Sequence, residues 1–212
     1  MEKDHLLPQH WEKALDFGCG IGRLTRGLTT HFEEVHGVDV APTMIEQAKK
    51  MNENYQNNDK IQFKLNLNND LSSFESSTYS FIYSTLVIQH IPYPASINYV
   101  RDFVRILKPG GKLVFQYPAK DIRVLTPIQK VKTFLKIRER LALLGIGKGF
   151  HMAMYVLDQN QVEKTIENHG GKVLKRYNTN HVNPDFDGNL EFIPEENSQF
   201  FVSKLLVVSK ES

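Results

Sequence analysis

Short apolar runs alternate along the chain with segments in which apolar residues recur every three or four positions. The run at 79–87 is continuous, as expected of a strand buried on both faces. Helical spacing follows Ile21, continues after Pro42 and returns between Ile97 and Leu107. Five runs have the character of strands: 13–17, 34–40, 60–66, 79–87 and 108–118.

This alternation of strand and helix predicts an α/β fold whose parallel sheet carries helices on both faces. The rhythm breaks after Pro118, where residues 119–150 have a helical and basic composition. It returns with a helix capped by Asp158 and with strands at 172–177 and 198–210. We therefore expect one domain over 1–212, a doubly wound sheet of seven strands. The last strand is expected to be antiparallel, and 119–150 to form a helical lid or insertion.

The composition is that of an ordinary globular protein, with 41% hydrophobic and 24% charged residues among 212. The net charge of +2 gives no general attraction to nucleic acid. Cys19 is the single cysteine, so no internal disulfide is expected, and a reducing compartment is favoured. No apolar run approaches the roughly 20 residues that span a bilayer, and no signal-peptide core precedes the first strand. The expected location is cytoplasmic.

Three glycines at alternate positions follow the first strand in the stretch "LDFGCGIG". Glycine accepts a positive φ and leaves no Cβ in the way, so a ligand can approach the backbone closely. A dinucleotide-binding loop has the spacing G-x-G-x-x-G, whereas here Arg23 stands at its third glycine. The carboxylate of Asp16 would repel a pyrophosphate and suits a ligand that carries an amino group.

The stretch "LDFGCGIG" resembles motif I of the class I S-adenosylmethionine-dependent methyltransferases. The stretch "GVDVAPTMIEQAKK" is similar to their second-strand segment. "LNNDLSSF", "YSFIYSTLVIQHI" and "VRDFVRILKPGGKLVFQ" resemble later motifs of the small-molecule, type 11 branch. The resemblance covers about residues 13–118 and, more weakly, 157–210, and Ser80 replaces the usual acid at the start of the fourth strand. It implies a Rossmann-like fold, S-adenosylmethionine as cofactor and S-adenosylhomocysteine as product.

The resemblance assigns the methionine and ribose portions of the cofactor to the first two strands. Gly18 and Gly20 would pack against these portions, and Asp16 would help to place the amino group. Asp39, at the end of the second strand, would bind the two ribose hydroxyls. The alternative is that Asp39 caps the following helix.

The same resemblance assigns the adenine to the end of the third strand. Asp70 would accept from the exocyclic amine, and the Leu71 N–H would face a ring nitrogen. Met44 and the stretch from Asn69 to Leu71 would cover the two faces of the base. The alternatives are that Asp70 is a turn residue and that Met44 belongs to the core.

The acceptor side is expected after the fourth strand. The backbone of Ser84 and Thr85 would meet the amino group of the cofactor, and His90 is the candidate general base. The alternative is that His90 caps or packs the turn. The basic face of 119–150 has two interpretations, a solvated lid or a surface attracted to an anionic acceptor or membrane.

These features predict in-line methyl transfer to a small-molecule nucleophile, with oxygen or nitrogen favoured over carbon. Nucleic acid is disfavoured because "QHIPY" stands where base-modifying methyltransferases have an "NPPY" element. No cluster has the spacing of a metal site. The alternatives are a non-catalytic S-adenosylmethionine-binding protein and a nicotinamide-dependent oxidoreductase.

Overall fold

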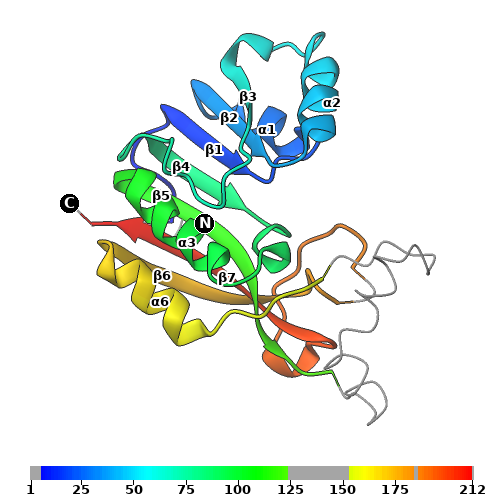
Figure 1. The fold of residues 1–212 in the computed structure, drawn as a ribbon, viewed down its shortest axis with the longest axis vertical. Helices are drawn as coiled ribbons and strands as arrows, with labels where there is room; N and C mark the ends of the chain where they lie inside the picture. Colours follow the sequence, from blue (N-terminus) through cyan, green and yellow to red (C-terminus); the bar gives the residue numbers. More distant parts are fainter. Residues whose placement is uncertain (1–5, 124–152, 184–185, 212) are drawn as a thin grey trace.

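The computed structural model describes residues 6–123, 153–183 and 186–211. Its centre is a seven-stranded sheet of order β3-β2-β1-β4-β5-β7-β6 (Figure 1). Strands β1 to β5 pair in parallel, and β7 runs antiparallel between β5 and β6. The predicted doubly wound sheet with an antiparallel last strand is therefore confirmed. The strands are β1 (Lys13–Phe17), β2 (Glu34–Asp39), β3 (Ile61–Leu65), β4 (Tyr79–Ser84), β5 (Leu107–Asp121), β6 (Gly171–Thr179) and β7 (Phe201–Lys210).

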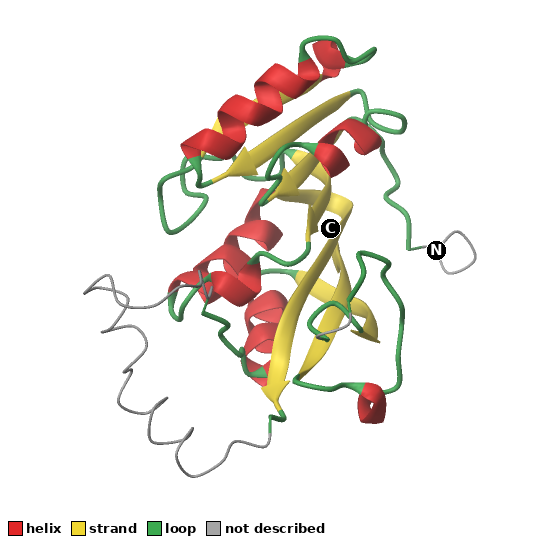
Figure 2. Cartoon of the chain, turned by 90° about the vertical axis from the view of Figure 1, so that its right-hand side faces the viewer, coloured by secondary structure: helices red, strands yellow, loops and turns green. Residues whose placement is uncertain are grey.

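Four α-helices among the described residues cover this sheet (Figure 2). Helices α1 and α2 pack on the β1–β3 end, whereas α3 and α6 lie together beside β5 and β6. The α-helices are α1 (Arg23–Leu28), α2 (Pro42–Asn52), α3 (Ala95–Ile106) and α6 (Gln159–Asn168), and the short 3-10 helices are η2 (Asn58–Lys60), η3 (Ile88–His90) and η4 (Glu195–Asn197). None of the helices in the described ranges has the length and apolar character required to cross a bilayer.

Two successive residues of β1 show that α1 and α3 lie on opposite faces of the sheet. The Asp16 carboxylate accepts a hydrogen bond from Thr25 of α1, and the Phe17 ring packs edge-on against Phe103 of α3. Successive side chains of a strand point to opposite faces. The α3 face also carries the main core, because α3 buries Val100, Phe103 and Val104 at helical spacing.

The structure corrects several predicted boundaries; β7, for example, begins at Phe201 rather than at 198. β5 continues to Asp121 through pairing with β7, so residues 119–121 belong to a strand rather than to a helical insertion. The remainder of the predicted lid, 124–150, lies outside the described residues, as does His151. β4 ends at Ser84 rather than at 87, because Leu86 adopts a φ of 62°, which a strand does not accommodate.

Candidate active site

The glycine turn after β1 is packed tightly on one side and open on the other. Gly18 and Cys19 donate their N–H groups to the Val38 carbonyl at 2.7 and 3.0 Å, which joins the turn to β2. Gly18 has a φ of 77°, and a Cβ there would lie 2.1 Å from Cγ2 of Val87. At Gly20, with a φ of 52°, an added Cβ would have no neighbour within 4 Å. The turn therefore requires glycine for its fold at position 18 and leaves space over Gly20.

Asp39 fixes the position of this turn through its carboxylate. Its Oδ2 accepts from the Gly20 N–H and its Oδ1 from the Ala41 N–H, each at 2.9 Å. Each carboxylate oxygen has two lone pairs, so both oxygens retain acceptor capacity. The bond to Ala41 shows that Asp39 also holds the residue that precedes α2, but it does not cap that helix, whose N-terminus has no side-chain cap. The carboxylate is held ready for hydroxyl donors beside open space.

Asp16 is directed toward α1 and is almost inaccessible, with 3% of its surface exposed. Its Oδ2 accepts from the Thr25 hydroxyl at 2.7 Å. Burial raises the pKa of this carboxyl from 3.8 to about 6, against the lowering effect of the Thr25 hydrogen bond. Asp16 therefore joins β1 to α1, and a cofactor amino group would feel its charge from beneath the turn.

Apolar side chains are exposed where the parallel strands end. They are 37% to 68% exposed and come from the glycine turn, the start of α2 and the segments after β2, β3 and β4. Because carboxyl ends of parallel strands meet at one edge of a sheet, these residues border the same edge. Exposed apolar surface of this kind suits a largely apolar ligand group. These residues are Ile21, Val40, Met44, Leu67 and Leu86.

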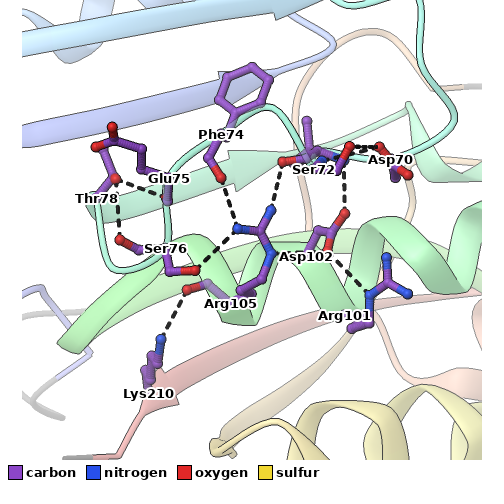
Figure 3. Close-up of polar contacts among 11 residues, drawn as sticks. Asp70, Ser72, Phe74, Glu75, Ser76, Thr78, Arg101, Asp102, Arg105 and Lys210 are labelled. Carbon is purple, nitrogen blue, oxygen red and sulfur yellow. Dashed lines mark hydrogen bonds and ion pairs between the residues drawn. The ribbon is translucent and has the colours of Figure 1, made fainter.

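The structure corrects the expected adenine contact of Leu71. Its N–H donates to Oδ2 of Asp102 at 2.8 Å and its side chain is fully buried, so this donor already has a partner in α3. The Asp70 carboxylate accepts from the N–H and hydroxyl of Ser72 (Figure 3). That arrangement matches the turn interpretation of Asp70 and lowers the pKa of its carboxyl. Asn69 is exposed between these residues and the end of β3.

The residues directly after β3 contact the end of β2, whereas Asp70 comes later in the chain. Asn66 donates its N–H to the Asp39 carbonyl at 2.9 Å, and its side chain is buried. Leu67 follows with 68% of its surface exposed. Leu67 is not among the residues predicted from the sequence, where an acid was expected to contact the adenine. The usable signal is position, since the first residues after a parallel strand face the ligand edge.

A left-handed residue marks the end of β4. Leu86 has a φ of 62°, and its N–H donates to the Oε1 of Gln116 on β5 at 2.9 Å. Ser84 is buried and Thr85 half-buried beside it. Positive φ is unfavourable for leucine, so the surrounding contacts must hold this conformation. Gln116 is fully buried, and no local sequence signal indicates its role.

His90, in η3, has a partner for each ring nitrogen. Its Nδ1 lies 3.0 Å from the Ala153 carbonyl, which can only accept, so Nδ1 carries the proton. Its Nε2 therefore accepts from the side-chain amide of Gln89, also at 3.0 Å. Gln89 in turn accepts from Gln116 at 3.3 Å. The two hydrogen bonds orient the ring and leave Nε2 unprotonated, with the side chain of Gln89 as its hydrogen-bond donor.

Among the described residues, neither the cysteine thiol nor a metal site adds to this arrangement. Cys19 is buried, and burial raises the pKa of its thiol to about 12, which keeps it protonated. Across the described ranges, no group of three or more histidine, cysteine, aspartate or glutamate side chains is placed to hold a metal ion.

Comparison with known proteins gives consistent relatives. The model of the family described as "Methyltransferase domain" matches residues 15–115. A ubiquinone biosynthesis O-methyltransferase from Nitrosococcus oceani is 29% identical over 175 residues, which are 82% of this chain and 68% of that protein. The protein of the same name from Acinetobacter baumannii is 27% identical over the same shares of the two chains.

Solved structures share the fold. A SAM-dependent methyltransferase from Methanosarcina mazei has a TM-score of 0.63 at 16% identity, covering 95% of this chain and 94% of its own. The magnesium protoporphyrin IX methyltransferase from Synechocystis, solved with bound SAH, has a TM-score of 0.59 at 16% identity, covering 93% and 73%.

The glycine turn gives a first prediction. Gly18→Ala should lower the free energy of unfolding by roughly 2 kcal/mol or more, because the new methyl group overlaps Val87 and the residue keeps a positive φ. Gly20→Ala is the matched control, with a positive φ but no neighbour, and should lose less. Urea unfolding of both variants measures the difference. Equal losses would contradict the packing of Val87 on Gly18.

The buried Asp16 gives a second prediction. A pKa raised from 3.8 to about 6 means that the folded state binds the proton more tightly, so this residue reduces stability as pH rises through that interval. Asp16→Asn removes the penalty. The variant's stability relative to wild type should increase by about 3 kcal/mol between about pH 3 and about pH 7. Urea unfolding without cofactor at several pH values tests it, and a constant difference would refute the shifted pKa.

Proposed function

We propose that the chain is a class I S-adenosylmethionine-dependent methyltransferase that methylates a hydroxyl oxygen of a small molecule. The observation that carries the placement of the cofactor is the Asp39 carboxylate, held by the Gly20 and Ala41 N–H groups beside open space. S-adenosylmethionine supplies an activated methyl group on a positively charged sulfur. The protein then has to hold the cofactor, align the acceptor with the methyl group and shield the reaction from water.

We assign the ribose hydroxyls to Asp39 and the methionine portion to the glycine turn. Gly18 and Gly20 would let the cofactor approach the backbone, with the buried Asp16 favouring its amino group from below. Thr85 and the Ser84 backbone, at the end of β4, would border the same portion. These assignments rest on the edge that β1, β2 and β4 share.

For the adenine we propose the exposed apolar residues around the end of β3. Met44, in the first turn of α2, and Leu67 would cover the ring. Asn69 and Asp70 lie further along the chain and would contribute at the rim at most. Leu71 is removed from the assignment, because its N–H is bonded to Asp102.

The acceptor would lie against the end of β4, near η3. Holding an acceptor in line with the methyl group can supply on the order of 7–11 kcal/mol of the barrier. A hydroxyl must also lose its proton. Our candidate for the base is Nε2 of His90, in the helix η3 that follows β4. To act as base, Nε2 would exchange the Gln89 amide for the acceptor hydroxyl, while the Ala153 carbonyl keeps Nδ1 protonated.

The named relatives support oxygen as the acceptor atom, because those reported above are O-methyltransferases. Nitrogen stays the second candidate, since an amine acceptor would not need His90 as base. A nicotinamide-dependent oxidoreductase is not favoured, because the buried carboxylate of Asp16 lies where a pyrophosphate would be repelled.

The ribose assignment gives a third prediction. Asp39→Ala should weaken S-adenosylmethionine binding roughly tenfold or more, because charge-assisted hydrogen bonds are lost. Asp70→Ala is the matched control and should stay within about twofold, since its carboxylate is bonded to Ser72 and is exposed. Calorimetric titration measures both affinities, and circular dichroism checks that each variant folds. An unchanged affinity in Asp39→Ala would refute the assignment.

The acceptor assignment gives a fourth prediction. Formation of S-adenosylhomocysteine is followed with a panel of small phenols and amines, and the best phenol is then used with variants. His90→Ala should lower kcat by about 100-fold or more if the histidine takes the hydroxyl proton. His169→Ala, an exposed histidine at the end of α6, is the control. Undiminished turnover in His90→Ala would rule out the base, and turnover with amines alone would overturn the hydroxyl acceptor.

A further inference from the structure

A cavity of about 520 Å³ lies apart from the glycine turn, over β1, β2 and β3. It opens on the α3 face of the sheet. His36 and Val38 are two positions apart in β2 and therefore point to the same face, and Val38 belongs to the main core with Phe103. Residues 66–78, all of which the structure describes, connect β3 to β4 without a helix and form its wall. The charged and aromatic side chains that line it are Lys13, His36, Lys64, Phe74, Glu75 and Tyr79.

The wall of this cavity is fixed to α3. Arg105 donates to the Phe74 carbonyl at 2.8 Å and to the Leu71 carbonyl at 2.6 Å (Figure 3). Asp102 accepts the Leu71 N–H at 2.8 Å from the same helix. Backbone groups held in this way do not have to be ordered when a ligand arrives. The cavity is thus a built feature of the fold rather than a gap beside a loose loop.

The charges on the floor compensate one another. Lys13 pairs with Glu34 at 2.7 Å, and Glu34 also accepts from Nε2 of His36 at 2.6 Å. Nε2 therefore carries the proton, and Nδ1 accepts from the Tyr79 hydroxyl at 2.7 Å. Burial lowers the pKa of His36, which keeps the ring neutral near pH 7. This chain of contacts leaves no excess charge from β1 and β2.

Lys64 of β3 differs from these residues. Its side chain is half-buried, and among the described residues it has neither a hydrogen bond nor an ion pair. Its Nζ lies 5.9 Å from the centre of the Phe74 ring, and it interacts electrostatically with Lys13 and Glu34, whose charges are opposite in sign. Partial burial of an ammonium group is costly unless an anion compensates it. Among the residues that line the cavity, only the exposed Glu75 carries a carboxylate, and it stands on the wall rather than the floor.

We propose that this cavity binds a small organic anion whose carboxylate or phosphate pairs with Lys64 and whose apolar part lies on Phe74. The site is separate from methyl transfer, since Asp39, the glycine turn and His90 do not line it. Its charge and its aromatic wall come from residues that the methyl-transfer function does not use.

The test is a nuclear magnetic resonance titration of the ¹⁵N-labelled protein with benzoate, phenyl phosphate and inorganic phosphate. Ionic strength is held constant with chloride. Saturable shifts of the amides of Lys64, Phe74 and their neighbours are expected with benzoate or phenyl phosphate. Shifts that stay linear with every probe would overturn the site, and saturation by inorganic phosphate alone would overturn the role of Phe74.

Three variants make the test specific. Lys64→Met should weaken binding roughly tenfold or more, Lys64→Arg should retain it, and Glu75→Gln should strengthen it. Because Lys64 lies outside the proposed cofactor site, Lys64→Met should still bind S-adenosylmethionine, which shows that it is folded. Equal anion binding by wild type and Lys64→Met would refute the proposal without bearing on the methyltransferase assignment.

Discussion

The carboxylate of Asp39 is the constraint on which the carboxyl edge of the sheet depends. It accepts one N–H from the glycine turn after β1 and another from the start of α2, while its carbonyl accepts from Asn66 after β3. One residue at the end of β2 therefore sets the relative positions of three loops. The same residue keeps acceptor capacity beside Gly20, where the backbone is open. The structural role of this side chain therefore does not exclude the ribose contact that we propose for it.

The end of β4 is held by a different and longer-range device. Gln116 on β5 accepts the N–H of Leu86, donates to Gln89 beside His90 and also donates to Ser203 on β7 at 2.9 Å. A buried amide can make these contacts only if every partner is in place, because unpaired polar groups are costly in the interior. The strained backbone of Leu86 and the orientation of His90 are therefore linked through the middle of the sheet. Val87 adds a steric link, since it packs on Gly18.

Helix α3 both packs in the main core and holds the connection between β3 and β4. Its apolar face builds the main core with Phe17 and Phe115, and its polar residues Asp102 and Arg105 bind the connection between β3 and β4. That connection carries no helix, and four of its residues line the cavity over the strands. The bond from the Leu71 N–H to Asp102 also means that this donor is not available to a ligand at the carboxyl edge of the sheet.

The alternation of strands and helices, the glycine turn and the acid that ends β2 could all be predicted from the sequence. They depend on local periodicity and on glycine's access to positive φ. The sequence also indicated the antiparallel last strand by position. The fold itself was needed to show that Asp16 faces α1, that Leu71 is bonded to Asp102, that Leu67 is exposed at the edge after β3, and that Gln116 holds Leu86. Each of these is a contact between residues distant in the chain, and local pattern carries no information about which buried donor meets which acceptor.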